Sequence, residues 1–262
     1  MKVIGIQIDT VWEDKPASHA RVETLLGDID IARGTLIVLP EMFATGFSPD
    51  VSKIAEAAGD GPTQTFLSGL AARRKAFVLG GVVTHGEAGR GRNEAVVYGP
   101  DGAELVRYQK LFPFTFGKET DHYGRGDTTA RFECGDFKVA PFVCYDLRFP
   151  EVFRIEARRG AELYAVIANW PAARQDHWMA LLRARAIENQ AFVIGVNRCG
   201  RDPKHSYSGR SQIIDPRGRV LADAGQSEGL VRAELNRAEL VEYRATFPAL
   251  SDVRDEYLAD DA

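Results

Sequence analysis

Segments with the pattern of β-strands alternate with segments of helical spacing from one end of this chain to the other. In the first half, the sequence predicts strands at 2–8, 35–40 and 76–84, and helices at about 16–33 and 62–75. The run at 35–40 is apolar from Leu36 onward, which is typical of a strand buried on both faces of a sheet. This alternation predicts an α/β fold, because each helix must bury its apolar stripe against a sheet.

The second half of the chain repeats this rhythm. Further elements are expected at 93–98, 103–110, 138–143, 163–169, about 176–190 and 191–197, followed by a hairpin that joins 211–214 to 219–222. No linker or low-complexity stretch interrupts the pattern. We therefore expect one α/β domain over residues 1–262, with a polar, helical C-terminal tail from about residue 236.

The composition argues against several classes of protein. The 262 residues carry a net charge of −4 with acids and bases interspersed, so no nucleic-acid or membrane partner is expected. Residues 1–9 alternate and end in a charge, which predicts a strand and not a signal peptide. The three cysteines are an odd number without Cys-x-x-Cys spacing, which indicates free thiols in a reducing compartment. We expect a soluble, cytoplasmic protein.

Cys144 lies where a predicted strand turns into a helical pattern. The strand 138–143 precedes it, and apolar residues at one-face spacing follow from Phe149. At such a turn, the positive end of the helix is expected to lower the pKa of the thiol, and the next backbone N–H groups can hold an oxyanion. A buried structural cysteine is the alternative. That alternative leaves the charged Asp146-x-Arg148 directly behind it unexplained, so the segment favours a nucleophile.

Two other predicted strands also end on a residue with useful chemistry. Glu41 follows the strand 35–40, and Lys110 ends the strand 103–110. Because ligands of α/β sheets collect at the carboxyl ends of strands, the carboxylate, the ammonium and the Cys144 thiol are expected to converge in one cleft. There the carboxylate can accept the thiol proton, the thiolate can attack a carbonyl carbon, and the ammonium can stabilise the oxyanion.

Other kinds of site have no support in the sequence. The five histidines occur outside any Cys–His signature, and no His-x-x-x-His or Cys/His cluster indicates a metal. The sequence has no Gly-x-x-x-x-Gly-Lys-Ser/Thr motif and no Gly-x-Gly-x-x-Gly motif after a strand, so nucleotide binding has no support. We therefore expect no metal and no cofactor.

At Glu41, Lys110 and Cys144 together, the chain resembles the nitrilase superfamily of carbon–nitrogen hydrolases, along nearly its whole length. The segments that carry the likeness are Leu39-Pro40-Glu41, Tyr108-Gln109-Lys110 and Val143-Cys144-Tyr145-Asp146. The resemblance implies a four-layer α-β-β-α sandwich that forms a homodimer or a higher homo-oligomer, usually through helices after the nucleophile. It also implies a general base at Glu41, a stabilising cation at Lys110 and a nucleophile at Cys144. Glu119 best matches a second glutamate that orients the lysine.

Within that superfamily, three segments look most like the omega-amidase branch: 144–150, 168–171 and 184–190. This implies a cofactor-independent amidase that hydrolyses the terminal amide of 2-oxoglutaramate or 2-oxosuccinamate, which are small anionic substrates. The candidate substrate-binding residues are Tyr145, Arg148, Asn169 and Trp170. Arg148 can place a planar fork on a substrate carboxylate, with a structural ion pair to Asp146 or Glu151 as the alternative. Trp170 either lines the pocket or belongs to the core.

The chain departs from this branch after the lysine. Lys110-Leu111-Phe112-Pro113 lacks the histidine that the branch commonly carries. The register of the loop 111–126, and with it the role of Glu119, is therefore left open, as is the preferred omega-amide. Another amidase, a carbamoylase or a nitrilase of the same superfamily is the nearest alternative. A catalytically silent binding or scaffold protein is the alternative from a different class.

Overall fold

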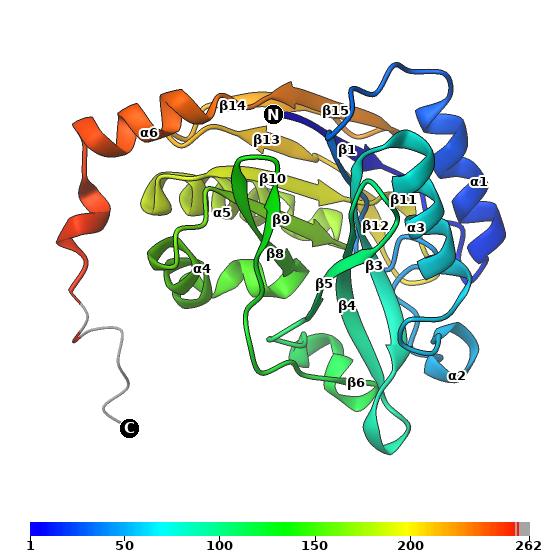
Figure 1. The fold of residues 1–262 in the computed structure, drawn as a ribbon. Coiled ribbons are helices and arrows are strands. Elements are labelled where there is room, and N and C mark those ends of the chain that lie inside the picture. The colour runs from blue at the N-terminus through cyan, green and yellow to red at the C-terminus, as the bar shows by residue number, and fades with distance from the viewer. Residues whose placement is uncertain (255, 257–262) are drawn as a thin grey trace.

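Two mixed β-sheets pack face to face, and helices cover the outer face of each (Figure 1). The computed structural model describes residues 1–254 and residue 256. The first sheet has seven strands, six of them in the order β15 (Gly229–Glu234), β1 (Lys2–Gln7), β2 (Leu36–Val38), β3 (Phe77–His85), β4 (Gly91–Tyr98) and β5 (Glu104–Gln109), with β6 (Tyr123–Gly124) beside β4. Its strands β1, β2 and β3 run parallel, and β15, β4 and β5 extend it in antiparallel pairings.

The second sheet has six strands, in the order β14 (Val220–Asp223), β13 (Gln212–Ile214), β10 (Phe192–Asn197), β9 (Leu163–Ala168), β8 (Phe137–Val143) and β7 (Phe132–Cys134). Again the three central strands, β8, β9 and β10, are parallel and the outer pairings are antiparallel. Every residue of β9 is buried, as its continuous apolar sequence predicts. A separate hairpin pairs β11 (Cys199–Arg201) with β12 (Ser206–Ser208).

The helices form the two outer layers. They are α1 (Lys15–Leu26), α2 (Val51–Ile54), α3 (Pro62–Arg74), α4 (Pro150–Arg158), α5 (Gln175–Asn189) and α6 (Arg237–Thr246). In Figure 1, α1 and α3 lie on the side of the first sheet, and α4 and α5 on the side of the second. The predicted four-layer α-β-β-α sandwich is therefore confirmed. Among the described residues, no helix is long and apolar enough to cross a membrane.

The two sheets approach each other closely at Gly5 in β1. A Cβ atom at this position would lie 2.7 Å from Val231 in the same sheet and 2.8 Å from Val196 in the opposite one. Glycine is therefore required here by the packing of the two sheets and not by the turn geometry that usually favours it.

The bounds of several elements differ from those expected from the sequence, and α2 and the hairpin of β11 and β12 were not expected. Helix α1 ends at Leu26 and not near residue 33, because Gly27 (φ 43°) leaves the helical conformation. Cys144 begins a short 3-10 helix, η4 (Cys144–Arg148), before α4 starts at Pro150. The chain from about 236 forms α6, whereas residues 255 and 257–262 of the expected domain and tail lie outside the described residues.

Candidate active site

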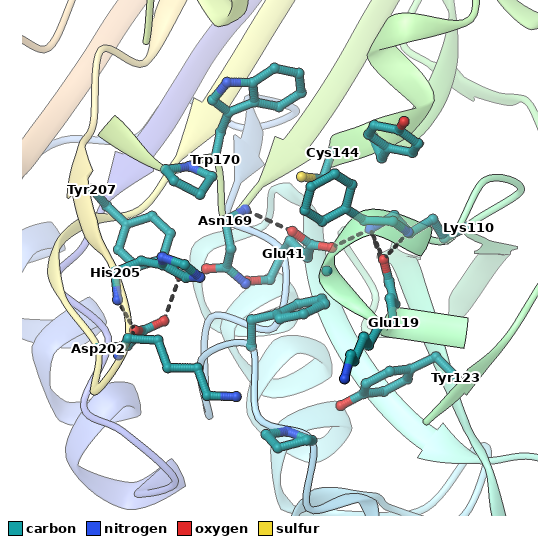
Figure 2. Close-up of a pocket in the computed structure, with 18 of the residues that line it drawn as sticks. Glu41, Lys110, Glu119, Tyr123, Cys144, Asn169, Trp170, Asp202, His205 and Tyr207 are labelled. Atoms are coloured by element: carbon teal, nitrogen blue, oxygen red, sulfur yellow. Dashed lines mark hydrogen bonds and ion pairs between the residues drawn. The ribbon is translucent and has the colours of Figure 1, made fainter. Parts of the chain in front are cut away.

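Three strand ends meet at one edge of the sandwich and bring Glu41, Lys110 and Cys144 together (Figure 2). Glu41 follows β2, Lys110 follows β5, and Cys144 follows β8 of the opposite sheet. The Lys110 Nζ atom lies 3.0 Å from Glu41 Oε1, and both side chains are buried. The predicted convergence of the three side chains is thus present in the structure. The first sheet contributes Glu41 and Lys110, and the second contributes Cys144.

The Glu41 carboxylate is held by donors on both oxygen atoms. Its Oε1 accepts hydrogen bonds from Lys110 Nζ and from Asn93 Nδ2 at 2.7 Å, whereas its Oε2 accepts one from the backbone N–H of Asn169 at 2.7 Å. Asn169 Nδ2 also donates to the Glu41 carbonyl. A carboxylate oxygen with two donors is a weaker proton acceptor than one with a single donor, so Oε2 is the better placed of the two to take a proton.

Glu119 lies against the other side of Lys110. Its two oxygen atoms are 2.8 and 3.0 Å from Lys110 Nζ, and it accepts further hydrogen bonds from Asn93 Nδ2 and from the backbone N–H of Phe114. The loop 111–126 therefore folds back so that Glu119 reaches the lysine, which answers the question of register that the sequence left open. Burial by itself lowers the pKa of Lys110, but the carboxylates of Glu119 and Glu41 outweigh it and raise that pKa well above its usual value.

Cys144 has a backbone conformation that is rare outside glycine, with φ at +48°. This turn places the thiol at the cavity, where it remains partly exposed. Burial and the neighbouring Glu41 carboxylate raise the pKa of Cys144 well above its usual value, and the Lys110 ammonium offsets this only in part. The expectation that the helix end lowers this pKa is therefore wrong, because desolvation and a nearby negative charge dominate over the dipole of one short 3-10 turn.

The four candidate substrate-binding residues all line the same cavity, which has a volume of about 190 Å³. Tyr145 packs on Phe114, with ring centroids 4.9 Å apart. Asn169 also holds Glu41, as described above. Trp170 is only 3% exposed and is therefore both a wall of the cavity and part of the core. A cavity of this size fits a small substrate and is below the range of pockets for drug-sized ligands.

Arg148 is not engaged in the structural ion pair that was its alternative role. Within the described residues its guanidinium lies 4.8 Å above the Trp170 ring and 3.2 Å from His177 Nδ1, and no ion pair joins it to Asp146 or Glu151. The guanidinium therefore remains available to a ligand at the cavity.

Asp146 is a site-forming residue to which sequence analysis gave no role of its own. It is fully buried and accepts hydrogen bonds from Tyr108 Oη, from the Val143 N–H and from the Phe112 N–H, at 2.7 to 3.0 Å. Burial raises the pKa of Asp146 to about 6, although Lys110 and these donors oppose the rise. By joining β5, β8 and the loop after Lys110, the carboxylate fixes the turn at Cys144 relative to the lysine.

Replacing Tyr108 by phenylalanine tests this link. Tyr108→Phe removes the hydroxyl donor to Asp146, and we expect a loss of ~1.5–3 kcal/mol in the free energy of unfolding, the range for a hydrogen bond to a charged group. Tyr164→Phe is the matched control, because Tyr164 Oη donates to a neutral carbonyl, that of Phe153, and its loss should cost only ~0.5–1.5 kcal/mol. Urea denaturation measures both. Equal costs would mean that the Asp146 charge adds nothing to this bond.

Comparisons with known proteins agree with this geometry. The model of the family described as carbon-nitrogen hydrolase matches residues 3–245. Among curated relatives, a 2-oxoglutaramate amidase of Bacillus subtilis (strain 168) is 34% identical, covering 92% of this chain and 93% of the relative. Omega-amidase YafV of Escherichia coli (strain K12) is 37% identical over 98% of each chain. Among solved structures, a CN-hydrolase superfamily protein from Xanthomonas campestris, with an arsenic adduct in its active site, is 36% identical, covers 97% of each chain and has a TM-score of 0.86.

Proposed function

The chain belongs to the carbon–nitrogen hydrolase family, and from this premise we propose that it is a cysteine-dependent omega-amidase. Its substrates would be the terminal amides of 2-oxo dicarboxylic acids, such as 2-oxoglutaramate and 2-oxosuccinamate, and its products the free acid and ammonia. The observation that carries the proposal is the contact of Lys110 with both Glu41 and Glu119 beside the Cys144 thiol. The names of the two relatives above supply the substrate class.

In the first half of the proposed reaction, the Cys144 sulfur attacks the amide carbon while Glu41 accepts the thiol proton. Because the pKa of Cys144 is raised, the resting thiol keeps its proton, and the base must remove it as the carbon–sulfur bond forms. The negative charge that develops on the amide oxygen is stabilised by the Lys110 ammonium, which Glu119 orients. The carbon–nitrogen bond then breaks, and Glu41 returns the proton to the departing nitrogen, which leaves as ammonia.

In the second half, water attacks the resulting thioester. Glu41 accepts a proton from the water, the tetrahedral intermediate again places its charge near Lys110, and the carbon–sulfur bond breaks. The proton returns to sulfur, so the carboxylic acid is released and the resting thiol is restored. The balance is one amide and one water to one acid and one ammonia.

Ammonia release from a substrate panel tests the proposal. The panel contains 2-oxo acid amides, simple monoamides, carbamoyl amines and nitriles, and we expect the highest kcat/KM on the 2-oxo acid amides. A preference for carbamoyl amines or nitriles would assign the chain to another activity of the family. Absence of turnover on the whole panel would favour a catalytically silent protein.

Arg148 should contribute selectivity for the anionic substrate. Arg148→Lys keeps the charge but loses the planar fork. The activation free energy for 2-oxoglutaramate should therefore rise by ~1.5–3 kcal/mol relative to that for the neutral butyramide, and the ratio of the two kcat/KM values should fall accordingly. That corresponds to about 10- to 150-fold. Ammonia release from both substrates gives the ratio directly. An equal loss on both would mean that Arg148 is structural, while the proposed amidase chemistry would stand.

We also propose that the protein acts as a homodimer or higher homo-oligomer in the cytoplasm. The helices after the nucleophile expose apolar side chains, with Ile155 in α4, Ile187 in α5 and Val241 in α6 between 37% and 49% exposed. A contact between copies through these helices would remove this apolar area from water. The three free cysteines fit a reducing compartment. Sedimentation of the purified protein measures the oligomeric state.

A further inference from the structure

A second arginine, Arg174, reaches the same cavity as Arg148. It belongs to the short helix η5 (Ala172–Arg174), which precedes α5, and its side chain is partly buried. Its guanidinium carbon lies 5.3 Å from the centre of the Phe114 ring, which lines the same cavity. Sequence analysis passed over this residue, because nothing in the pattern of residues 171–175 separates it from a surface arginine.

Neither Arg148 nor Arg174 has a carboxylate partner within residues 1–254 and 256. Two other partly buried arginines do have one: Arg107 pairs with Glu94 and Glu104, and Arg210 with Asp223, whereas Arg244 donates to backbone carbonyls instead. Taking a guanidinium partly out of water is costly unless acceptors replace the lost hydration. The cavity therefore contains two cations that no carboxylate of the described residues neutralises.

The carboxylates that line the cavity are already engaged elsewhere. Glu41 and Glu119 hold Lys110. Asp202 accepts hydrogen bonds from the backbone N–H groups of Lys204 and His205 and from the Tyr207 hydroxyl, so it is used to shape its own loop. No ion pair joins any of the three to either arginine, so an anionic ligand in the cavity would be the first carboxylate to pair with them.

Trp170 contacts the side chain of Arg148 and the backbone of Arg174. The Arg148 guanidinium lies over its ring, and its indole Nε1 donates a hydrogen bond of 2.8 Å to the carbonyl of Arg174. The indole ring itself is held in the core against Trp178. The Arg148 guanidinium and the Arg174 backbone therefore rest on one rigid side chain, and the Arg174 guanidinium rests on Phe114, which lowers the entropic cost of ordering both side chains around an anion.

We propose that Arg174 and Arg148 together form a subsite for the 2-oxo acid end of the substrate. A 2-oxo acid presents three acceptor oxygen atoms in one plane, two on the carboxylate and one on the oxo group. One planar fork can engage only two of them, so a second guanidinium accounts for recognition of the third. The proposal rests on the proposed function for the identity of the substrate, but the subsite itself binds an anion whether or not turnover occurs.

Binding of 2-oxopentanoate tests the subsite directly. This probe has the 2-oxo acid end and an unreactive propyl chain, so its affinity does not depend on catalysis. We expect titration calorimetry to give a Kd at least about tenfold higher for Arg174→Gln than for the unmodified protein, the effect of losing a hydrogen bond to a charged group. Arg217→Gln is the matched control, since Arg217 also stacks on an aromatic ring, that of Tyr243, but outside the cavity; its Kd should not change.

Equal affinity of the unmodified protein and Arg174→Gln for 2-oxopentanoate would overturn the proposal, and so would failure of the unmodified protein to bind it. Valerate, which lacks only the oxo group, should bind the unmodified protein more weakly, and Arg174→Gln should narrow this difference. Circular dichroism of both variants establishes that they are folded.

Turnover separates this proposal from the proposed function. Arg174→Gln should lower the kcat/KM ratio of 2-oxoglutaramate to butyramide about tenfold or more, and Arg217→Gln should leave the ratio unchanged. If the unmodified protein binds 2-oxopentanoate through Arg174 but hydrolyses no 2-oxo acid amide, the proposed function fails and the subsite stands. If it hydrolyses the amide and Arg174→Gln leaves both the ratio and the Kd unchanged, the subsite fails and the function stands.

Discussion

Cys144→Ala is expected to abolish amide hydrolysis while the protein remains folded. Removal of a nucleophile that acts together with a base and an oxyanion donor costs on the order of 10⁶-fold in kcat. The small residue that replaces it leaves the buried contacts of Glu41 with Lys110 and Asn169 in place. Ammonia release and thermal unfolding measure the two properties. Substantial turnover in a folded variant would contradict the assignment of the nucleophile.

Cys134→Ala is the matched control for this substitution. Cys134 is fully buried in β7, outside the lining of the cavity, so activity should survive its replacement. Alkylation by iodoacetamide provides a second check, because Cys144 is partly exposed whereas Cys134 and Cys199 are buried. Burial raises the pKa of those two thiols to about 12, and the pKa of Cys144 is raised as well, so exposure and not pKa distinguishes Cys144. We expect Cys144 to be labelled first, with a loss of activity that follows the labelling.

The pH dependence of that labelling tests the raised pKa of Cys144. Because only the thiolate is alkylated and the pKa is raised, the rate should continue to increase as the pH rises through 9. A rate that is already constant at neutral pH would mean that the thiolate is stable beside Lys110. The proposed proton transfer to Glu41 would then precede substrate binding.

The ends of the strands were predictable from the sequence because they depend on local patterns. The apolar runs before Glu41 and Cys144 specify buried strands, whereas the strand before Lys110 is mixed in sequence and partly exposed. Strands that run in the same direction carry the residues that follow them to the same edge. That is why the convergence of these three side chains could be expected without coordinates, even though the thiol comes from the second sheet.

Contacts that depend on how loops fold back were not predictable in this way. Asn93 lies at the buried start of a regular strand, and nothing local reveals that its amide bridges Glu41 and Glu119. Arg174 is recognisable only when its guanidinium is found over the ring of Phe114, which comes from a loop about sixty residues earlier, in the lining of one cavity. The prediction of a lowered pKa for Cys144 failed for the same reason. The helix-dipole argument considers only neighbours in the sequence, whereas the pKa is raised by burial and by the carboxylate of Glu41, which is distant in the sequence.

The second large effect is expected for Glu41→Gln. Glutamine has nearly the same shape but accepts no proton, so kcat/KM for 2-oxoglutaramate should fall about 10²- to 10⁴-fold, the contribution of a positioned general base. The glutamine side-chain amide also cannot accept all the hydrogen bonds that the Glu41 carboxylate accepts. Lys110 and Asn93 donate to one oxygen and the Asn169 N–H to the other, so an NH₂ group must face a donor in either orientation.

Glu94→Gln separates the chemical effect of Glu41→Gln from its structural one. Glu94 is a buried carboxylate of the same sheet that binds Thr84 and Arg107 and does not line the cavity. Its replacement should lower the temperature of unfolding but leave kcat close to that of the unmodified protein. The double variant Glu41→Gln/Cys144→Ala should be no less active than Cys144→Ala alone, because a base without a nucleophile has no proton to accept. If Glu41→Gln raised only KM, with kcat unchanged, Glu41 would bind substrate, and the proton acceptor would have to be sought elsewhere among the groups that face Cys144.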